Sequence, residues 1–388
     1  MILAALLLPV AVAALVFATQ RLRLPAFLAL MVVAVGYGLA ANMTYQSIGK
    51  AFGQGFASAL EQTGLLVVAG ALVGVLLLKR TLPGAGAVVA GVLAGLGGSA
   101  AGGLALLQPA GRAIGLALAI LAVHALLVPS PLAVAALSVM KADLRTTSLF
   151  ALPVALTALA VAWRWAARHD QTGGAWSWGW LAIAVPLALL IVQAIAQMPS
   201  EPLGKGGARE FYTGISRSLI LAVLAVALAM ALSRRWQPAA LADTSWAPLL
   251  LAVGAAGGFG RLLDETGMAE LWAERLLDPR LGLLAPFLAA LVVKTLQGNS
   301  LSAVLTASGM IEPMLPALGL DSATGRALAA AAVGAGSIAI CHVNDPVFWI
   351  AAHMARLPVG RALYVVSLGS LVVAASAMVA LMVVRLAI

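Results

Sequence analysis

The feature that most constrains this chain is a succession of apolar segments, each about as long as a membrane-spanning helix and free of charge. A helix needs about 20 predominantly apolar residues to cross the hydrocarbon core of a bilayer. Hydrophobic residues make up 63% of the 388 residues and charged residues only 10%, too few to cover a water-facing surface. We therefore predict an all-α, polytopic membrane protein.

Ten segments are predicted to cross the membrane completely. Two further apolar segments, 84–110 and 281–315, are interrupted by glycine and polar residues. Such backbone is tolerated inside a membrane only where it is buried in protein or lines a wet cavity, so both segments are predicted to be re-entrant hairpins. The ten predicted crossings are 2–19, 24–41, 60–78, 113–140, 146–163, 178–197, 215–233, 246–263, 325–355 and 362–384.

The positions of Lys and Arg predict the orientation, because cytoplasmic loops carry an excess of both. The first segment lacks the basic start of a signal peptide, so it is predicted to remain as a spanning helix. Ten crossings place both termini on the periplasmic or extracellular side. Lys141 and Arg145 then fall outside, as an exception. Eleven other Lys and Arg residues are predicted to lie on the cytoplasmic side: Arg21, Arg23, Lys79, Arg80, Arg112, Arg164, Arg168, Arg234, Arg235, Arg356 and Arg361.

Composition also excludes several classes of protein function. The longest polar stretch, 198–214, is only a loop, which argues against an ATP-driven pump with its own nucleotide domain. Cys341 is the one cysteine, so an intramolecular disulfide and a cysteine-ligated metal site have no support. The net charge of +9 comes from basic pairs between apolar runs, as expected of cytoplasmic loops and not of a nucleic-acid partner. An ion gradient is the expected energy source, with no cofactor beyond a coupling proton or sodium ion.

The order of segments is repeated in two halves, 1–170 and 171–388. Each half is predicted to contain scaffold helices and one hairpin, followed by a helix interrupted by polar or proline residues, 113–140 and 325–355. An odd number of crossings in each half turns the second half upside down, which is the inverted repeat of secondary transporters. The hairpins and interrupted helices would then meet near the membrane midplane.

The last interrupted helix holds the polar groups that are most costly to bury. His342, Asn344 and Asp345 lie in an apolar run, where such groups are rare unless they face a pathway. Pro346 cannot donate a backbone hydrogen bond and disfavours helix at the preceding residue, so the backbone is predicted to open there. The helix that follows would present free N–H groups to a carboxylate.

Lys294, in an apolar hairpin arm, has two interpretations. A buried ammonium is costly unless it is paired, so Lys294 either extends to the outer interface or holds an anion. His124 is assigned a supporting role behind the site, and the charged stretch 264–280 is expected along the outer interface. No metal site is predicted. The predicted substrate-binding residues are Ser99, Ser130, Lys294, Gln297, Gly298, Asn299, Ser300, Ser337, His342 and Asn344.

The string His-Val-Asn-Asp at 342–345, followed by Phe-Trp at 348–349, resembles the His-Val-Asn-Asp-Ser-Gly-Phe-Trp signature of the gluconate permease family. Segments 52–56, 257–259 and 294–300 also resemble motifs of this family, and they occur in the same order along the chain. Pro-Val stands where the family has Ser-Gly, and lysine where it has arginine. The resemblance implies a homodimer with elevator-type mobile domains, in the ion transporter superfamily, and proton-coupled symport of sugar acids and related carboxylates.

The leading hypothesis is a secondary active transporter that imports a small hydroxylated carboxylate, such as a gluconate-like sugar acid or a short hydroxy acid, by proton symport. Asp345 and His342 are the groups expected to take up the proton. Sodium-coupled transport of a carboxylate or a D-amino acid is the alternative. An intramembrane enzyme and a channel are further alternatives, but no catalytic Ser/Lys, Cys/His or metal-ligand spacing accompanies these residues. We therefore expect no enzyme.

Overall fold

The structure is a computed structural model that describes residues 2–77, 82, 84–170, 177–233, 244–275 and 278–388. Every regular element in these ranges is a helix, which confirms the all-α prediction. The predicted cytoplasmic residues Lys79, Arg80, Arg234 and Arg235 lie outside the described residues.

The first half of the chain begins with two short apolar helices and ends with a long one. Its helices are α1 (Ile2–Gln20), α2 (Ala26–Ala40), α3 (Tyr45–Ala59), η1 (Leu60–Gly64), α4 (Leu65–Leu76), α5 (Gly84–Leu96), α6 (Ala100–Leu106), η2 (Gln108–Ala110), α7 (Ala113–Leu126), α8 (Pro131–Met140) and α9 (Leu144–Ala166).

The second half also ends with a long helix. Its helices are η3 (Trp178–Trp180), α10 (Leu181–Ala196), α11 (Gly207–Ile215), α12 (Ser218–Ser233), α14 (Ala247–Asp264), α15 (Met268–Arg275), η4 (Pro279–Leu281), α16 (Leu284–Gln297), α17 (Ser300–Ile311), η5 (Glu312–Met314), α18 (Ala323–Gly336), α19 (Pro346–Met354), α20 (Val359–Ala362), η6 (Leu363–Ser367) and α21 (Leu368–Leu386).

Six helices in the described ranges are long and apolar enough to cross a membrane, or seven if α11 and α12, bent by 51°, count as one span. The protein is therefore a polytopic membrane protein, as predicted. Shorter apolar helices such as α2 and α16 fall below the length of a full crossing, so the count of ten crossings stays a prediction. The six are Tyr45–Leu76, Ala113–Met140, Leu144–Ala166, Trp178–Ala196, Ala247–Asp264 and Val359–Leu386.

Both segments predicted to be hairpins fold as two helices joined by a tight turn, α5–α6 and α16–α17. Ser99 caps α6, and the side-chain oxygen of Asn299 caps α17 by accepting backbone N–H bonds of 2.9 and 3.2 Å. Gly298 has a φ of 72°, and a Cβ atom there would lie 2.4 Å from the carbonyl oxygen of Asn344. Only glycine therefore allows the second hairpin to approach the break before α19 so closely.

Two helix pairs are separated by short irregular segments, 127–130 between α7 and α8 and 337–345 between α18 and α19. In each case a proline, Pro131 or Pro346, begins the second helix. Proline is tolerated at this position because its missing N–H would have no partner inside the helix. Ser130 and Asp345 precede the prolines and cap the helices with their side-chain oxygens.

The predicted start of the third crossing at residue 60 is wrong. The helix begins 15 residues earlier, at Tyr45, and runs through the π-helical turn η1 into α4. Thr44 starts it by accepting a hydrogen bond of 3.2 Å from the backbone N–H of Ser47. The α3 sequence is rich in glycine and polar residues, so its hydropathy does not reveal a helix.

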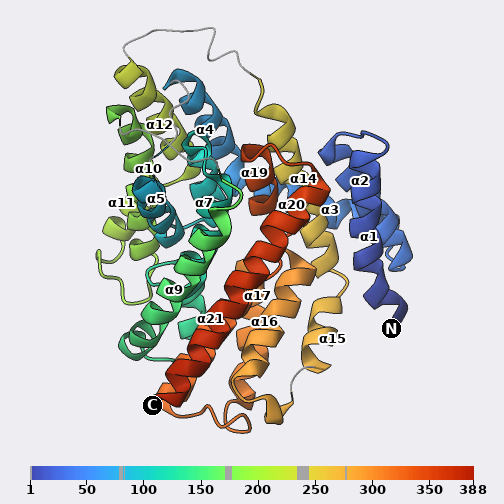
Figure 1. Cartoon of the computed structure of the whole chain (residues 1–388), viewed down its shortest axis with the longest axis vertical. Helices are drawn as coiled ribbons and strands as arrows, with labels where there is room; N and C mark the ends of the chain where they lie inside the picture. The colour runs from blue at the N-terminus through green and yellow to red at the C-terminus, as the bar shows by residue number, and fades with distance from the viewer. Residues whose placement is uncertain (1, 78–81, 83, 171–176, 234–243, 276–277) are drawn as a thin grey trace.

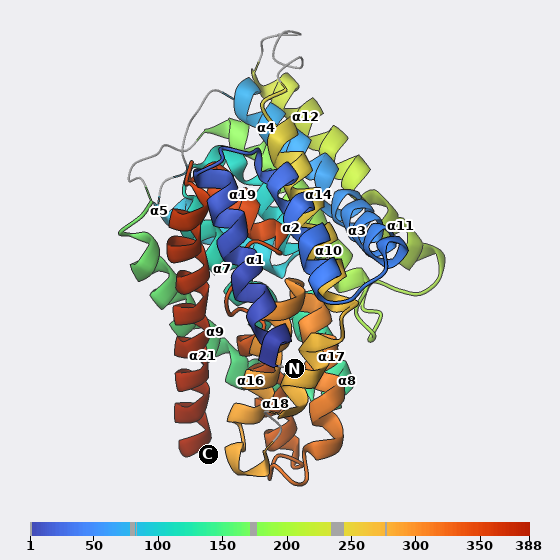
Figure 2. The same ribbon diagram turned by 90° about the vertical axis from the view of Figure 1, so that its right-hand side faces the viewer.

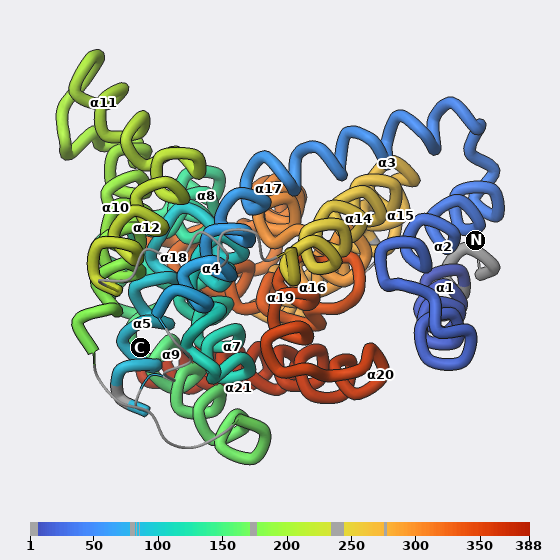
Figure 3. Tube along the Cα trace, turned by 90° about the horizontal axis from the view of Figure 1, so that it is seen from above, coloured from blue at the N-terminus to red at the C-terminus, as the bar shows by residue number. Residues whose placement is uncertain are grey.

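Helices from both halves pack together around the centre of the molecule. Figures 1 and 2 show α9 and α21 running side by side, and Figure 3 shows α3 crossing from the end that holds α1 and α2 toward α4. Along this path α3 packs on α14. A Cβ atom at Gly55 would lie 2.3 Å from the carbonyl oxygen of Gly257, so the two backbones are in direct contact.

Candidate functional site

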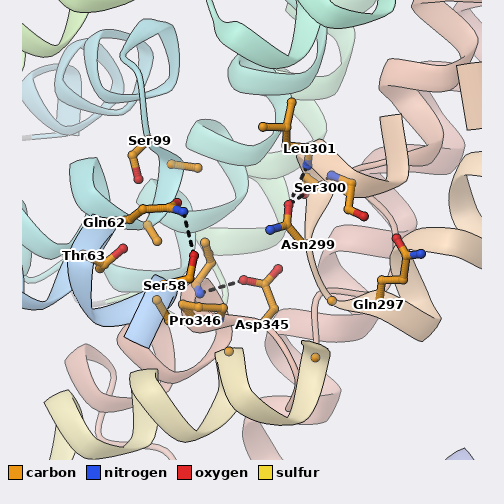
Figure 4. Close-up of a pocket in the computed structure, with 18 of the residues that line it drawn as sticks. Ser58, Gln62, Thr63, Ser99, Gln297, Asn299, Ser300, Leu301, Asp345 and Pro346 are labelled. Atoms are coloured by element: carbon orange, nitrogen blue, oxygen red, sulfur yellow. Dashed lines mark hydrogen bonds between the residues drawn. The ribbon is translucent and has the colours of Figure 1, made fainter. Parts of the chain in front are cut away.

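A cavity of about 650 Å³ lies where the helix interruptions of both halves meet (Figure 4). Its wall includes the turn before α6, the first residues of α8, the hairpin tip at 297–300, and the break that leads into α19. Residues of α3, η1 and α14 complete the wall. The turns and breaks of the fold therefore converge on one polar cavity.

Four helices begin at this cavity: α6, α8, α17 and α19. The first N–H groups of a helix have no partner inside it and give its start a positive partial charge. The capping side chains of Ser99, Ser130, Asn299 and Asp345 satisfy only one or two of these groups in each helix. The arrangement favours an anion in the cavity.

Lys294 and Asp345 form an ion pair inside the protein, with side-chain exposures of 1% and 6%. The Lys294 ammonium also donates to the carbonyl oxygen of Gly298 at 2.9 Å. Asp345 accepts a 2.8 Å bond from the backbone N–H of Val347, and the Cys341 thiol donates to it at 3.3 Å. The interpretation that Lys294 extends to the outer interface is therefore wrong, because a buried carboxylate supplies its counter-ion.

The structure separates the predicted site residues into two groups. Ser130, Lys294, Ser337 and His342 do not line the cavity, although Ser130 caps a helix that begins there. Ser337 donates to the carbonyl oxygen of Gly334 at 2.7 Å. The residues that do line the cavity are Ser99, Gln297, Gly298, Asn299, Ser300, Asn344 and Asp345.

His342 lies behind the hairpin tip. Its side chain is 4% exposed, and Nε2 lies 2.7 Å from the carbonyl oxygen of Thr295. The Asn344 amide donates to the same oxygen at 3.1 Å and to the carbonyl oxygen of Leu296 at 3.2 Å. Both side chains thus hold the end of α16 against the break before α19.

His124 connects the first hairpin to the first interrupted helix. It lines the cavity itself, so the predicted position behind the site is wrong. Its Nδ1 atom lies 2.9 Å from the carbonyl oxygen of Gly95 on α5. The Ser130 hydroxyl donates to the backbone carbonyl oxygen of His124. His124 therefore supports the start of α8 as well as the wall.

The wall formed by α3, η1 and α14 was not predicted from the sequence. Ser58, Gln62 and Thr63 line the cavity, and the four-residue spacing from Ser58 to Gln62 on one helix face was a usable signal. Arg261 also lines it and pairs with Asp264 at 2.6 Å. The expectation that the charged stretch from Asp264 lies along the outer interface is therefore wrong at its first residue, because α14 carries that residue to the cavity.

An apolar helical bundle whose helix breaks converge on one polar cavity has the architecture of a membrane transporter. The chain belongs to the GntP permease family, whose sequence profile matches residues 2–101 and 165–387. This confirms the resemblance drawn from the His-Val-Asn-Asp string and makes the protein a transporter, not an enzyme. The unmatched part, 102–164, contains α7, α8 and most of α9.

Two named relatives are similar over most of their length, and a third over less than half of it. A gluconate permease of Pseudomonas aeruginosa is 24% identical over 412 residues, which cover 91% of each chain. The low-affinity gluconate transporter of Escherichia coli is 26% identical over 400 residues, 87% of this chain and 88% of its own. The Escherichia coli inner membrane permease YgbN is 27% identical over 191 residues, 47% of this chain and 41% of its own.

Proposed function

We propose that the protein is a secondary active transporter that imports a small hydroxylated carboxylate by proton symport across the inner membrane. The observation that carries the proposal is the cavity at which α6, α8, α17 and α19 begin. Helix N-termini provide N–H donors and positive partial charge, which suit a carboxylate. The names of the relatives make gluconate the first substrate to test.

The Lys294–Asp345 ion pair supports proton coupling. In the empty carrier the two charges cancel. A substrate carboxylate adds one negative charge, and a proton on Asp345 removes one, so that Lys294 is left to balance the anion. Empty and loaded carriers then both move without net charge at the site, which avoids the cost of an unpaired charge within the bilayer. His342, whose Nδ1 has no partner in the described part of the chain, is the second candidate for the proton.

Sodium coupling, with a carboxylate or a D-amino acid as substrate, is the second candidate function. The side-chain carbonyl oxygens of Asn344 and Gln297 are buried without a hydrogen-bond partner among the described residues. Neutral oxygens of this kind, together with backbone carbonyls at a helix break, can coordinate Na⁺.

Uptake of radiolabelled gluconate into proteoliposomes distinguishes the two functions. We expect accumulation that requires an inward proton gradient, collapses with a protonophore, and persists when sodium is replaced by choline. Accumulation that needs sodium and survives the protonophore would favour the alternative. Failure to take up or exchange gluconate or any short hydroxy acid would contradict the proposed substrate class.

We also propose that the two halves, 1–170 and 171–388, form an inverted repeat in a homodimer with elevator-type movement. The order of elements supports this: α5–α6, α7–α8 and α9 in the first half correspond to α16–α17, α18–α19 and α20–α21 in the second. Figure 1 shows the start of α1 and the end of α21 both in the lower half of the view, which supports two termini on the same side of the membrane.

Accessibility of single cysteines tests this orientation. We expect a cysteine at position 23 or 356 to be protected from an impermeant reagent in intact cells, because both are predicted to be cytoplasmic. A cysteine at position 205, in the predicted periplasmic loop, should react quickly. The native Cys341 is buried and gives little background. Equal labelling rates at all three positions would contradict the orientation.

A further inference from the structure

The cavity has a polar wall that the proposed carboxylate site does not use. Gln54, Ser58, Gln62 and Thr63 of α3 and η1 form this wall, which we call the α3 wall. In Figure 4 its labelled residues Ser58, Gln62 and Thr63 lie across the cavity from Asn299 and Ser300 at the hairpin tip. The geometry points to the α3 wall as a second subsite, which binds hydroxyl groups of the substrate chain.

A local change of helix type builds the α3 wall. In an α-helix, residues four apart lie on one face, which aligns Gln54, Ser58 and Gln62. The turn Leu60–Gly64 is π-helical, so its hydrogen bonds join residues five apart. Thr63 is thereby brought to the same face as Ser58. The Ser218 hydroxyl of α12 supports this turn by donating to the carbonyl oxygen of Gln62 at 3.1 Å. Such turns inside α-helices are frequent at functional sites.

The side chains of the α3 wall have unused hydrogen-bonding capacity. Thr63 is 3% exposed, and its hydroxyl group has no partner within the described part of the chain. The Gln62 amide donates to the Ser58 hydroxyl oxygen at 3.2 Å, which leaves the Ser58 O–H and the Gln62 carbonyl oxygen available. Hydroxyl groups of a ligand, which both donate and accept, can pair with all three.

The α3 wall offers only neutral hydrogen-bonding groups. The α3 wall has no ionised side chain of its own, and the charged side chains that line the cavity belong to other elements: Arg261 and Asp264 of α14, which pair with each other, and Asp345 at the start of α19, which pairs with Lys294. A substrate whose carboxylate lies at the helix starts would place the hydroxyl groups of its chain against these neutral donors and acceptors. The inference rests on the proposed function and extends it to specificity: the α3 wall selects acids that carry hydroxyl groups beyond the third carbon.

Affinities for a long and a short acid test the subsite. Calorimetric titration of the full-length protein with gluconate and with glycerate compares six carbons with three. Thr63→Val keeps the side-chain shape and removes the hydroxyl group. We expect it to weaken gluconate binding about tenfold, equivalent to about 1.4 kcal/mol, and to leave glycerate affinity unchanged. Ser58→Ala and Gln62→Ala should act in the same direction.

Thr157→Val is the matched control, because Thr157 lies on the exposed face of α9 and its hydroxyl donates to the carbonyl oxygen of Pro153 at 2.9 Å. It should change neither affinity. Equal losses for both acids in the three wall variants, or unchanged gluconate affinity in all of them, would overturn the subsite. Ser58 and Gln62 are exposed to the cavity, so their variants remain informative if Thr63→Val does not fold. An unmodified protein that binds neither acid would instead overturn the proposed function, and the subsite with it.

Discussion

Lys294→Ala is expected to destabilise the protein and to weaken gluconate binding by one to two orders of magnitude. The ammonium group bonds Asp345 and the carbonyl oxygen of Gly298, so its removal leaves a buried carboxylate without a counter-ion and releases the hairpin tip. Breaking a buried ion pair in this way costs about 3–5 kcal/mol. Thermal unfolding in detergent and calorimetric titration with gluconate measure the two effects.

Two controls isolate the ion pair. The double variant Lys294→Ala/Asp345→Asn removes both charges, so it should regain most of the lost stability but not the affinity. Lys205→Ala removes a lysine whose side chain is 86% exposed and should change neither quantity. Unchanged stability in the Lys294→Ala protein would mean that Asp345 does not need this partner.

Asp345→Asn is expected to keep binding and exchange of gluconate but to lose uphill accumulation. Asparagine can still accept the hydrogen bond from the backbone N–H of Val347, so the start of α19 should persist. It cannot take up and release a proton, and the unpaired Lys294 favours an anion in the cavity at any pH. Proteoliposomes with and without an inward proton gradient should therefore reach the same internal concentration, while counterflow at symmetric pH continues.

His342→Ala is the comparison for this experiment. The His342 side chain is hydrogen-bonded to the carbonyl oxygen of Thr295. Removal of this side chain should therefore loosen the hairpin tip and impair gluconate binding as well as accumulation. Full gradient-driven accumulation by the Asp345→Asn protein would exclude Asp345 from the proton path and leave His342 or a sodium ion as the coupling group.

Local rules made much of the fold predictable. Long uncharged segments indicate membrane helices, and Pro131 and Pro346 begin helices because proline fits the first helical position. The family could also be identified from the sequence, because the His-Val-Asn-Asp string lies in one continuous segment. Each of these features depends on residues that are near neighbours in the sequence.

Features that depend on distant residues were not predictable. Lys294 and Asp345 are 51 positions apart in the chain. The sequence therefore does not indicate whether Lys294 is paired with a carboxylate or extends to the interface. Helix α3 is stabilised largely by packing against α14, where glycines such as Gly55 and Gly257 allow close contact. Its own composition is too polar and too rich in glycine for a hydropathy scan to detect. The α3 wall of the cavity was therefore missed.

The Lys294–Asp345 ion pair also bears on how the cell powers the carrier. Moving one elementary charge across a potential of 100 mV is worth about 2.3 kcal/mol. A site that is neutral when empty, and neutral again with one monoanion and one proton, moves no net charge in either direction. Such a cycle generates no current and draws nothing from the membrane voltage. Uptake would then follow the pH difference alone and would slow in alkaline surroundings, even in a fully energised cell.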